Sequence, residues 1–183
     1  MKKIKLKKKN RSTTSYRWLQ RHLNDEYVIK SKTEGFRSRS SYKLIEIEKK
    51  FKILSKSKNI LDLGCAPGGW LQVARMLCPK DSNILGIDRI KIEKMEEVNF
   101  IEKDIFDEDI FQIIKTNFNR KVDLVMSDMS PNSSGNKSVD HLRIISLVER
   151  VLEISKKILK PEGCLISKIF QGGAQGELID SMR

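Results

Sequence analysis

Residues 60–70 read ILDLGCAPGGW, an apolar segment that runs into a glycine-rich turn and then into the start of a helix. The glycines follow the spacing G-x-x-x-G-G, whereas dinucleotide-binding turns carry G-x-G-x-x-G. Gly64 permits a sharp turn, and we expect Gly68 and Gly69 to let a ligand approach the backbone because neither carries a Cβ atom. This segment therefore predicts a strand, a ligand-binding turn and a helix in succession.

Two residues near this turn limit the ligand that it can hold. Pro67 lacks a backbone N–H, so the turn has one donor fewer for a pyrophosphate. Asp62 lies inside the predicted strand, where its carboxylate can receive the ammonium group of an amino acid. The turn thus fits a nucleoside that has a charged amino-acid tail and no phosphates, and S-adenosylmethionine has that composition.

Apolar runs alternate with helical patterns along the rest of the chain. Strands are predicted at 59–64, 83–88, 98–104, 121–128 and 163–170, and helices at 69–78, 110–118 and 138–159. Such alternation predicts an α/β domain with a mostly parallel sheet and helices on both of its faces. The chain ends 13 residues after the last predicted strand. Because open sheets of this kind often have more than five strands, we expect the last C-terminal strands to be missing.

Aspartates end two further predicted strands. Asp88 ends the second strand, where a carboxylate can bind both hydroxyls of a ribose, as an acid does about 20 residues after the glycine turn in dinucleotide folds. Asp104 follows the third strand, within reach of an adenine amino group. A single aspartate in a turn is commonly only a cap. The ordered set at one sheet edge favours a site for the cofactor S-adenosylmethionine.

The last predicted strand, in GCLISKIFQGG (163–173), contains one charged residue, Lys168. Burying an ammonium group costs several kcal/mol unless partners replace the lost water. Asp128 ends the strand 121–128, which lies next to the last strand in the usual order for this topology. We therefore predict an ion pair between Lys168 and Asp128 beside the cofactor. The alternative for Lys168 alone is that its amine reaches solvent from a sheet edge.

The positive charge of the chain lies in its N-terminal third. Residues 1–58 contain 19 Lys and Arg against 5 Asp and Glu, whereas residues 59–183 contain 17 against 19. A basic block on a nearly neutral body is typical of proteins that bind polyanions such as nucleic acid. A solubilising tail and an anionic membrane surface are the weaker alternatives.

We divide the chain into a basic N-terminal arm, residues 1–24, and a domain, residues 25–183. Tyr16 and Trp18 lie in the arm, where they can stack on bases or dock the arm onto the domain. Early in the domain, a helix is predicted over about 38–54, with apolar side chains at three-to-four spacing.

Composition excludes several classes of protein. The three cysteines, Cys65, Cys78 and Cys164, show no metal-ligand spacing, and with only two histidines in the chain no metal is expected. No apolar run approaches the roughly 18 residues that cross a bilayer, and the basic N-terminus lacks the apolar segment of a signal peptide. We expect a cytoplasmic monomer that does not bind membranes.

Four segments together resemble the FtsJ/RrmJ family of RNA 2′-O-ribose methyltransferases. They are FRSRSSYKLIEI (36–47), ILDLGCAPGGW (60–70), LVMSDMSPN (124–132) and ISKIFQGG (166–173). The likeness runs from about residue 11 to 176 and is greatest to the branch that methylates a uridine of large-subunit ribosomal RNA. The resemblance implies a Rossmann-like methyltransferase fold, S-adenosylmethionine as donor, and 23S ribosomal RNA in the 50S subunit as partner.

The resemblance also implies roles for individual residues. The family's catalytic residues correspond to Lys43, Asp128 and Lys168, and its cofactor contacts correspond to Gly68, Trp70, Asp88, Asp104 and Asp128. A fourth catalytic residue, a glutamate, lies in the family on a later strand that this chain does not reach. Glu177 follows the last motif too closely to take that place. The arm and the first helix correspond to the family's RNA-binding region.

Other functions stay open at this point. Transfer RNA or a messenger RNA cap is an alternative substrate, because related branches carry the same four motifs. A non-catalytic RNA-binding factor for ribosome assembly, acting through the basic arm, is an alternative from another class. If the chain is an enzyme, Lys168 is the proposed base, or the group that orients the accepting hydroxyl.

Overall fold

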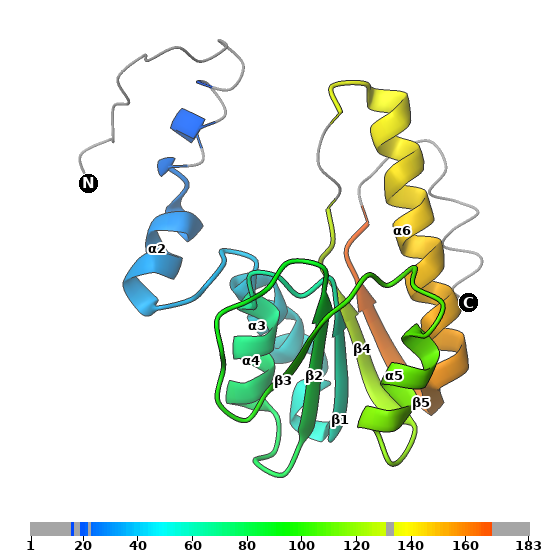
Figure 1. Ribbon diagram of the computed structural model, residues 1–183. Helices are drawn as coiled ribbons and strands as arrows, with labels where there is room; N and C mark the ends of the chain where they lie inside the picture. The colour runs from blue at the N-terminus through cyan, green and yellow to red at the C-terminus, as the bar shows by residue number, and fades with distance from the viewer. Residues whose placement is uncertain (1–15, 17–18, 22, 131–133, 170–183) are drawn as a thin grey trace.

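The computed structural model describes residues 16, 19–21, 23–130 and 134–169. Its elements are α2 (Glu26–Glu34), α3 (Ser41–Phe51), the short 3-10 helix η1 (Leu54–Lys56), β1 (Asn59–Leu63), α4 (Gly69–Leu77), β2 (Asn83–Asp88), β3 (Asn99–Glu102), α5 (Ile110–Asn117), β4 (Val122–Ser127), α6 (Lys137–Ile158) and β5 (Leu159–Ser167). The strands form one parallel sheet in the order β3-β2-β1-β4-β5 (Figure 1). The predicted α/β fold is confirmed.

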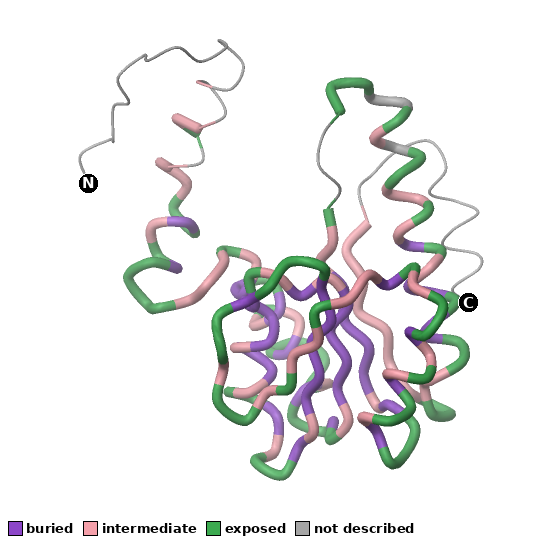
Figure 2. Tube along the Cα trace, viewed as in Figure 1, coloured by how far each residue is buried: buried purple, intermediate pink, exposed green. Residues whose placement is uncertain are grey.

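Both faces of the sheet are covered, because successive side chains of a strand point to opposite faces. Ile60 of β1 packs in one core cluster with side chains of α3 and α4. Its neighbour Leu61 packs in a second cluster with side chains of α5 and α6. The central strands β1, β2 and β4 are consequently buried almost throughout (Figure 2).

The last strand differs from its prediction. We expected a buried strand over 163–170, but β5 begins at Leu159, which pairs with Val122 across a register irregularity. Pro161 lies within this strand and is tolerated because β5 is the edge strand of the described sheet, where one side of the backbone needs no ladder partner. β5 contains no buried residue, and Lys168 follows its last residue.

The chain before the sheet contains a helix that the sequence analysis did not predict. α2 begins after Asp25, whose carboxylate accepts hydrogen bonds from the backbone N–H groups of Tyr27 (2.9 Å) and Val28 (3.2 Å), an N-cap. Gly35 ends the helix at a φ of 76°. Of the predicted arm, residues 1–24, the structure describes only residues 16, 19–21, 23 and 24. None of the described helices is long and apolar enough to cross a membrane.

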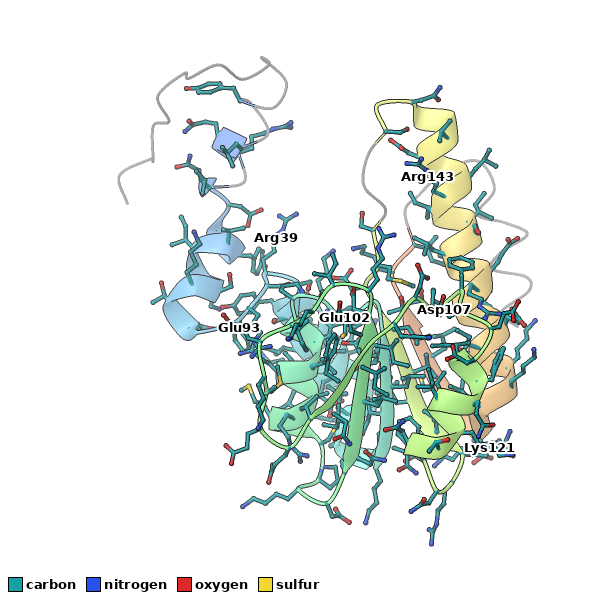
Figure 3. All side chains as sticks on the ribbon, viewed as in Figure 1. Arg39, Glu93, Glu102, Asp107, Lys121 and Arg143 are labelled. Carbon is teal, nitrogen blue, oxygen red and sulfur yellow. The ribbon has the colours of Figure 1, made fainter. Side chains whose placement is uncertain are left out.

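Two elements extend beyond the carboxyl edge of the sheet. α2 lies on one side of this edge, and the N-terminal half of α6 rises on the other (Figure 1). Two arginines lie on opposite sides of the space between α2 and α6 (Figure 3). They are Arg39, between α2 and α3, and Arg143, on α6. Asp88 ends β2 at this edge, and Asp128 and Lys168 follow β4 and β5 there.

Candidate active site

The glycine-rich turn after β1 is held by the end of the neighbouring strand. The Ala66 N–H donates to Asp88 Oδ2 at 2.8 Å, and the Gly64 N–H donates to the Ile87 carbonyl at 2.8 Å. Gly64 and Gly68 adopt φ values of 71° and 101°, which favour glycine. The last residues of β2 thereby fix the turn that the sequence predicted.

The space beside two of these glycines is filled by other parts of the chain. A Cβ atom on Gly69 would lie 2.9 Å from both Ser38 Cβ and Ser41 Oγ. The missing side chain of Gly69 therefore lets the start of α3 pack closely on α4, and the approach of a ligand to its backbone stays a prediction. A Cβ atom on Gly64 would lie 1.9 Å from Met129 Cγ. The absence of a side chain at Gly64 therefore leaves space for Met129, which follows β4.

Two clefts open at the carboxyl edge of the sheet. The first, which we call the β2–β3 cleft, has a volume of about 730 Å³ and is lined by Asp88, Ile90, Asp104, Ile105 and Arg143, among others. The second, the α2 cleft, has a volume of about 670 Å³ and is lined by Tyr27, Lys32, Lys43, Trp70 and Lys168, among others. Gly64, Ala66 and Asp128 line both clefts. The glycine turn and Asp128 thus form the wall that the two clefts share.

The β2–β3 cleft brings together three of the predicted cofactor residues, Asp88, Asp104 and Asp128. Asp88 is 9% exposed, and its other oxygen accepts the Ile90 N–H at 2.8 Å. Asp104 Oδ1 accepts the Phe106 N–H at 3.0 Å in a local turn. These backbone bonds hold both carboxylates at adjacent strand ends, as the order of the strands predicted.

The other two predicted cofactor residues lie elsewhere. Trp70 lines the α2 cleft and is 4% exposed, and its indole Nε1–H donates to the Ser40 carbonyl at 3.0 Å. Gly68 lines neither cleft, and a Cβ atom there would lie 3.0 Å from Arg37 Nη1. Both residues connect the turn to the segment that precedes α3, and their contact with a cofactor stays a prediction.

The predicted ion pair is present. Lys168 Nζ pairs with Asp128 Oδ1, and it also donates to the Asp128 carbonyl at 3.3 Å. The Lys168 N–H donates to the Ser127 carbonyl at 2.9 Å, which continues the pairing of β5 with β4. The side chain of Lys168 is 24% exposed and that of Asp128 is 17% exposed. The amine is therefore half-buried at the rim of the α2 cleft and not enclosed within the sheet.

Lys43 joins this pair from a different part of the chain. It lies on the first turn of α3, is exposed, and lines the α2 cleft together with Asp128 and Lys168. Residues more than 80 positions apart in the sequence thus contribute to one cleft. The three proposed catalytic side chains are together, on the same side of the sheet as the glycine turn.

Residues 36–183 match the family described as FtsJ-like methyltransferase, which is most of the chain. The chain belongs to this family. Proteins of Rickettsia felis and Rickettsia akari, both named ribosomal RNA large subunit methyltransferase E, are 46% identical to it over 180 residues. Each alignment covers 96% of this chain and 79% of the relative.

A solved structure supports the same membership. A protein of Plasmodium falciparum, described as a ribosomal RNA methyltransferase, superposes with a TM-score of 0.72 at 32% identity. The superposition covers 78% of this chain and 83% of that one. The FtsJ-like assignment therefore rests on both sequence and fold.

This FtsJ-like chain also contains the buried acid that the sequence analysis expected to receive the ammonium group of an amino acid. Asp62, in β1, is 1% exposed, lines the α2 cleft, and its Oδ2 has no hydrogen-bond partner among the described residues. Burial raises the pKa of Asp62 well above its usual value, and the charges of Asp128 and Asp88 add to the rise. An unpartnered buried carboxylate is costly and points to a cationic ligand group.

The sequence analysis missed two side chains of the α2 cleft. Tyr27 lies in α2, which was not predicted, and Arg37 was quoted in a motif without a role. Arg37 Nη1 and Nη2 donate to the carbonyls of Glu93 (2.8 Å) and Lys94 (3.1 Å), so it fastens the loop after β2 to the segment before α3. The signal for α2 was Asp25 at a helix N-cap position, ten residues before a glycine.

Proposed function

We propose that this chain transfers a methyl group from S-adenosylmethionine to a ribose 2′-hydroxyl of ribosomal RNA, in a uridine of the large-subunit RNA within the 50S subunit. One observation carries the proposal: Asp128 lies in the wall between two clefts and pairs there with Lys168. The Rickettsia relatives named as large-subunit ribosomal RNA methyltransferases support the choice of RNA.

The residues at the sheet edge fit S-adenosylmethionine chemically. In the β2–β3 cleft, Asp88 suits the two hydroxyls of the ribose, Asp104 suits the adenine amino group, and Ile90 and Ile105 supply apolar surface for the ring. The unpartnered oxygen of Asp62, beside the glycine turn, suits the ammonium group. When bound, the cofactor supplies a methyl group on a sulfonium that is already a strong electrophile.

The protein's own task is then to orient one hydroxyl and to accept its proton, which a lysine amine can do only in its uncharged form. Lys168 lines the α2 cleft next to the shared wall, where its amine can bind a 2′-hydroxyl and hold the oxygen in line for transfer. Asp128 keeps the amine in place through the ion pair. Lys43, which lines the same cleft, adds positive charge that favours a phosphate next to the accepting ribose.

The experiment that tests the proposal measures radiolabelled methyl transfer to undermethylated 50S subunits, free ribosomal RNA and transfer RNA. We expect label in the large-subunit RNA, with the most in the 50S subunit, and hydrolysis to nucleosides should recover it as a 2′-O-methyluridine. Label in transfer RNA alone would contradict the proposal that ribosomal RNA is the substrate. Tight RNA binding without any transfer would favour a non-catalytic assembly factor.

Substituting Asp62 by asparagine is expected to stabilise the ligand-free fold and to weaken cofactor binding. An acid whose pKa is raised by folding loses stability as pH rises from its unfolded to its folded pKa, so the amide should add on the order of 1–3 kcal/mol near neutrality. The gain should vanish at acid pH, where Asp62 is protonated in both states. Cofactor affinity should fall about tenfold or more, because the amide oxygen can accept from an ammonium but carries no opposite charge.

Thermal unfolding across the pH range and calorimetric titration with S-adenosylmethionine measure the two effects. Asp107→Asn is the matched control, since Asp107 is an exposed aspartate paired with Lys103 at 3.4 Å. We expect the control to change neither quantity appreciably. Unchanged cofactor affinity in Asp62→Asn would show that the buried carboxylate does not face the ammonium.

A further inference from the structure

The α2 cleft extends well beyond the catalytic pair. It continues past Lys43 to α2, where it meets Tyr27. Four aromatic side chains line the described part of this cleft, and Tyr27 alone among them is exposed, at 48%. Trp70, at 4%, and Tyr42, at 7%, belong to the core. Tyr27 is exposed and lies in the same cleft as the proposed acceptor site, so packing in the core does not explain its position.

Tyr27 is held in place from two sides. The Asp25 carboxylate accepts its backbone N–H at 2.9 Å, and the ring lies 5.5 Å from the Tyr42 ring at an interplanar angle of 47°. Tyr42 is fixed in turn, because its hydroxyl donates to Glu34 Oε2 at 2.7 Å and its ring meets Phe36 edge-on at 5.4 Å. Tyr27 is therefore a supported aromatic surface with part of its area open to the cleft.

Basic side chains outnumber acidic ones in the lining of the cleft. Lys32 and Lys43 are exposed and line the cleft, and Arg39, which pairs with Asp25, lines it as well. Lys30 lies over the Tyr42 ring, with Nζ 4.7 Å from the ring centroid. An aromatic surface among cations is the combination that binds single-stranded nucleic acid, whose bases stack on rings while its phosphates meet the cations.

We infer that Tyr27 stacks on a nucleobase of single-stranded RNA, at or next to the nucleotide whose ribose reaches Lys168. The inference rests on the proposed function, because that function sets an RNA ribose at the catalytic pair. Lys32 and Lys43 bind the flanking phosphates. Because every base has a flat face, stacking positions the strand without selecting its sequence, and the choice of nucleotide falls to other contacts.

Three substitutions at Tyr27 separate ring stacking from other roles. Tyr27→Ala removes the ring, Tyr27→Leu keeps apolar contact with Tyr42 without an aromatic face, and Tyr27→Phe keeps the face without the hydroxyl. We expect KM for undermethylated 50S subunits to rise about tenfold in the first two, the size expected for one lost base stack. The phenylalanine variant should stay within about twofold of the wild type, and cofactor affinity should not change in any of them.

Met76→Ala is the matched control. Met76 is 64% exposed near the end of α4 and does not line the α2 cleft, so its loss should leave KM unchanged. Thermal unfolding of all four variants checks that α2 remains folded. Equal KM values for Tyr27→Leu and the wild type would overturn the inference, and so would a phenylalanine variant as impaired as the alanine variant.

A binding measurement tests the stacking without catalysis. A short single-stranded RNA carrying 2-aminopurine should lose fluorescence on binding to the wild type and to Tyr27→Phe, but much less on binding to Tyr27→Leu. If the wild type binds this RNA with quenching yet methylates no RNA, the proposed function fails and the stacking stands. If it methylates RNA and the leucine variant quenches equally, the function stands and the stacking fails.

Discussion

Replacing Lys168 by alanine is expected to lower the rate of methyl transfer by about 10²–10⁴-fold, the usual contribution of a positioned acid–base group. The amine lines the α2 cleft and pairs with Asp128 of the shared wall, and no other described lysine pairs with Asp128. Affinity for S-adenosylmethionine should change little, because the cofactor residues Asp88 and Asp104 lie in the β2–β3 cleft. Single-turnover transfer and calorimetric titration measure the two quantities separately.

Lys160, in the strand β5 that Lys168 follows, gives the matched control. Lys160 pairs with Asp123 at 2.7 Å, an ion pair between the same two strands at the opposite end of the sheet. We expect Lys160→Ala to leave the transfer rate unchanged. Full activity in Lys168→Ala with cofactor bound would rule out the proposed role.

The arginine variant separates two roles of Lys168. Arginine keeps the positive charge and the ion pair, but it does not release its proton near neutrality. If Lys168 accepts the proton of the hydroxyl, Lys168→Arg should be nearly as slow as Lys168→Ala. Recovery of most of the rate would show that Lys168 only orients the hydroxyl.

Substituting Gly64 by alanine is expected to destabilise the fold by about 2–5 kcal/mol, the sum of left-handed backbone strain and forced repacking. The added Cβ would lie 1.9 Å from Met129 Cγ, closer than any real contact, so Met129 has to move. Because Met129 follows Asp128 in the chain, the displacement should also disturb the ion pair with Lys168. Cofactor binding and transfer should both be lost to a large extent.

Gly35→Ala is the control that isolates the backbone strain. Gly35 has a φ of 76°, close to the 71° of Gly64, but nothing lies within 4 Å of an added Cβ atom. Its cost should be about 1–2 kcal/mol and should not reach the active site. Thermal unfolding gives both values, and a Gly64 variant no less stable than the Gly35 variant would show that Met129 adapts without cost.

Several features of the fold could be predicted because they depend on local pattern. Apolar runs such as 59–64 and 83–88 match β1 and β2 closely, since strands buried on both faces exclude polar residues. α2 was missed because its apolar side chains are few, and its ends are set by Asp25 and Gly35 instead. The start of β5 was misplaced because Pro161 reads as a breaker, and only its position at a sheet edge makes it tolerable.

The candidate site divides in the same way. Asp88 and Asp104 could be predicted as neighbours, because parallel strands bring their carboxyl ends to one edge whatever the details of packing. The packing at Gly69 could not be predicted, since the atoms that fill the space beside it come from Ser38 and Ser41, which are distant in the sequence. A role can be assigned to Tyr27 and Arg37 only because the structure shows that both line the α2 cleft.

By itself the sequence determined the parallel α/β architecture, the glycine turn after β1 and the charged residues at the strand ends. Each of these features depends on residues that are close together along the chain. Only the tertiary structure decided that Lys43, Asp128 and Lys168 share a cleft, that Asp62 is buried with an unpartnered oxygen, and that Tyr27 faces the same space. The physical reason is that burial, ion pairing and cleft shape depend on which surfaces meet after folding, and those surfaces come from segments that are far apart in the sequence.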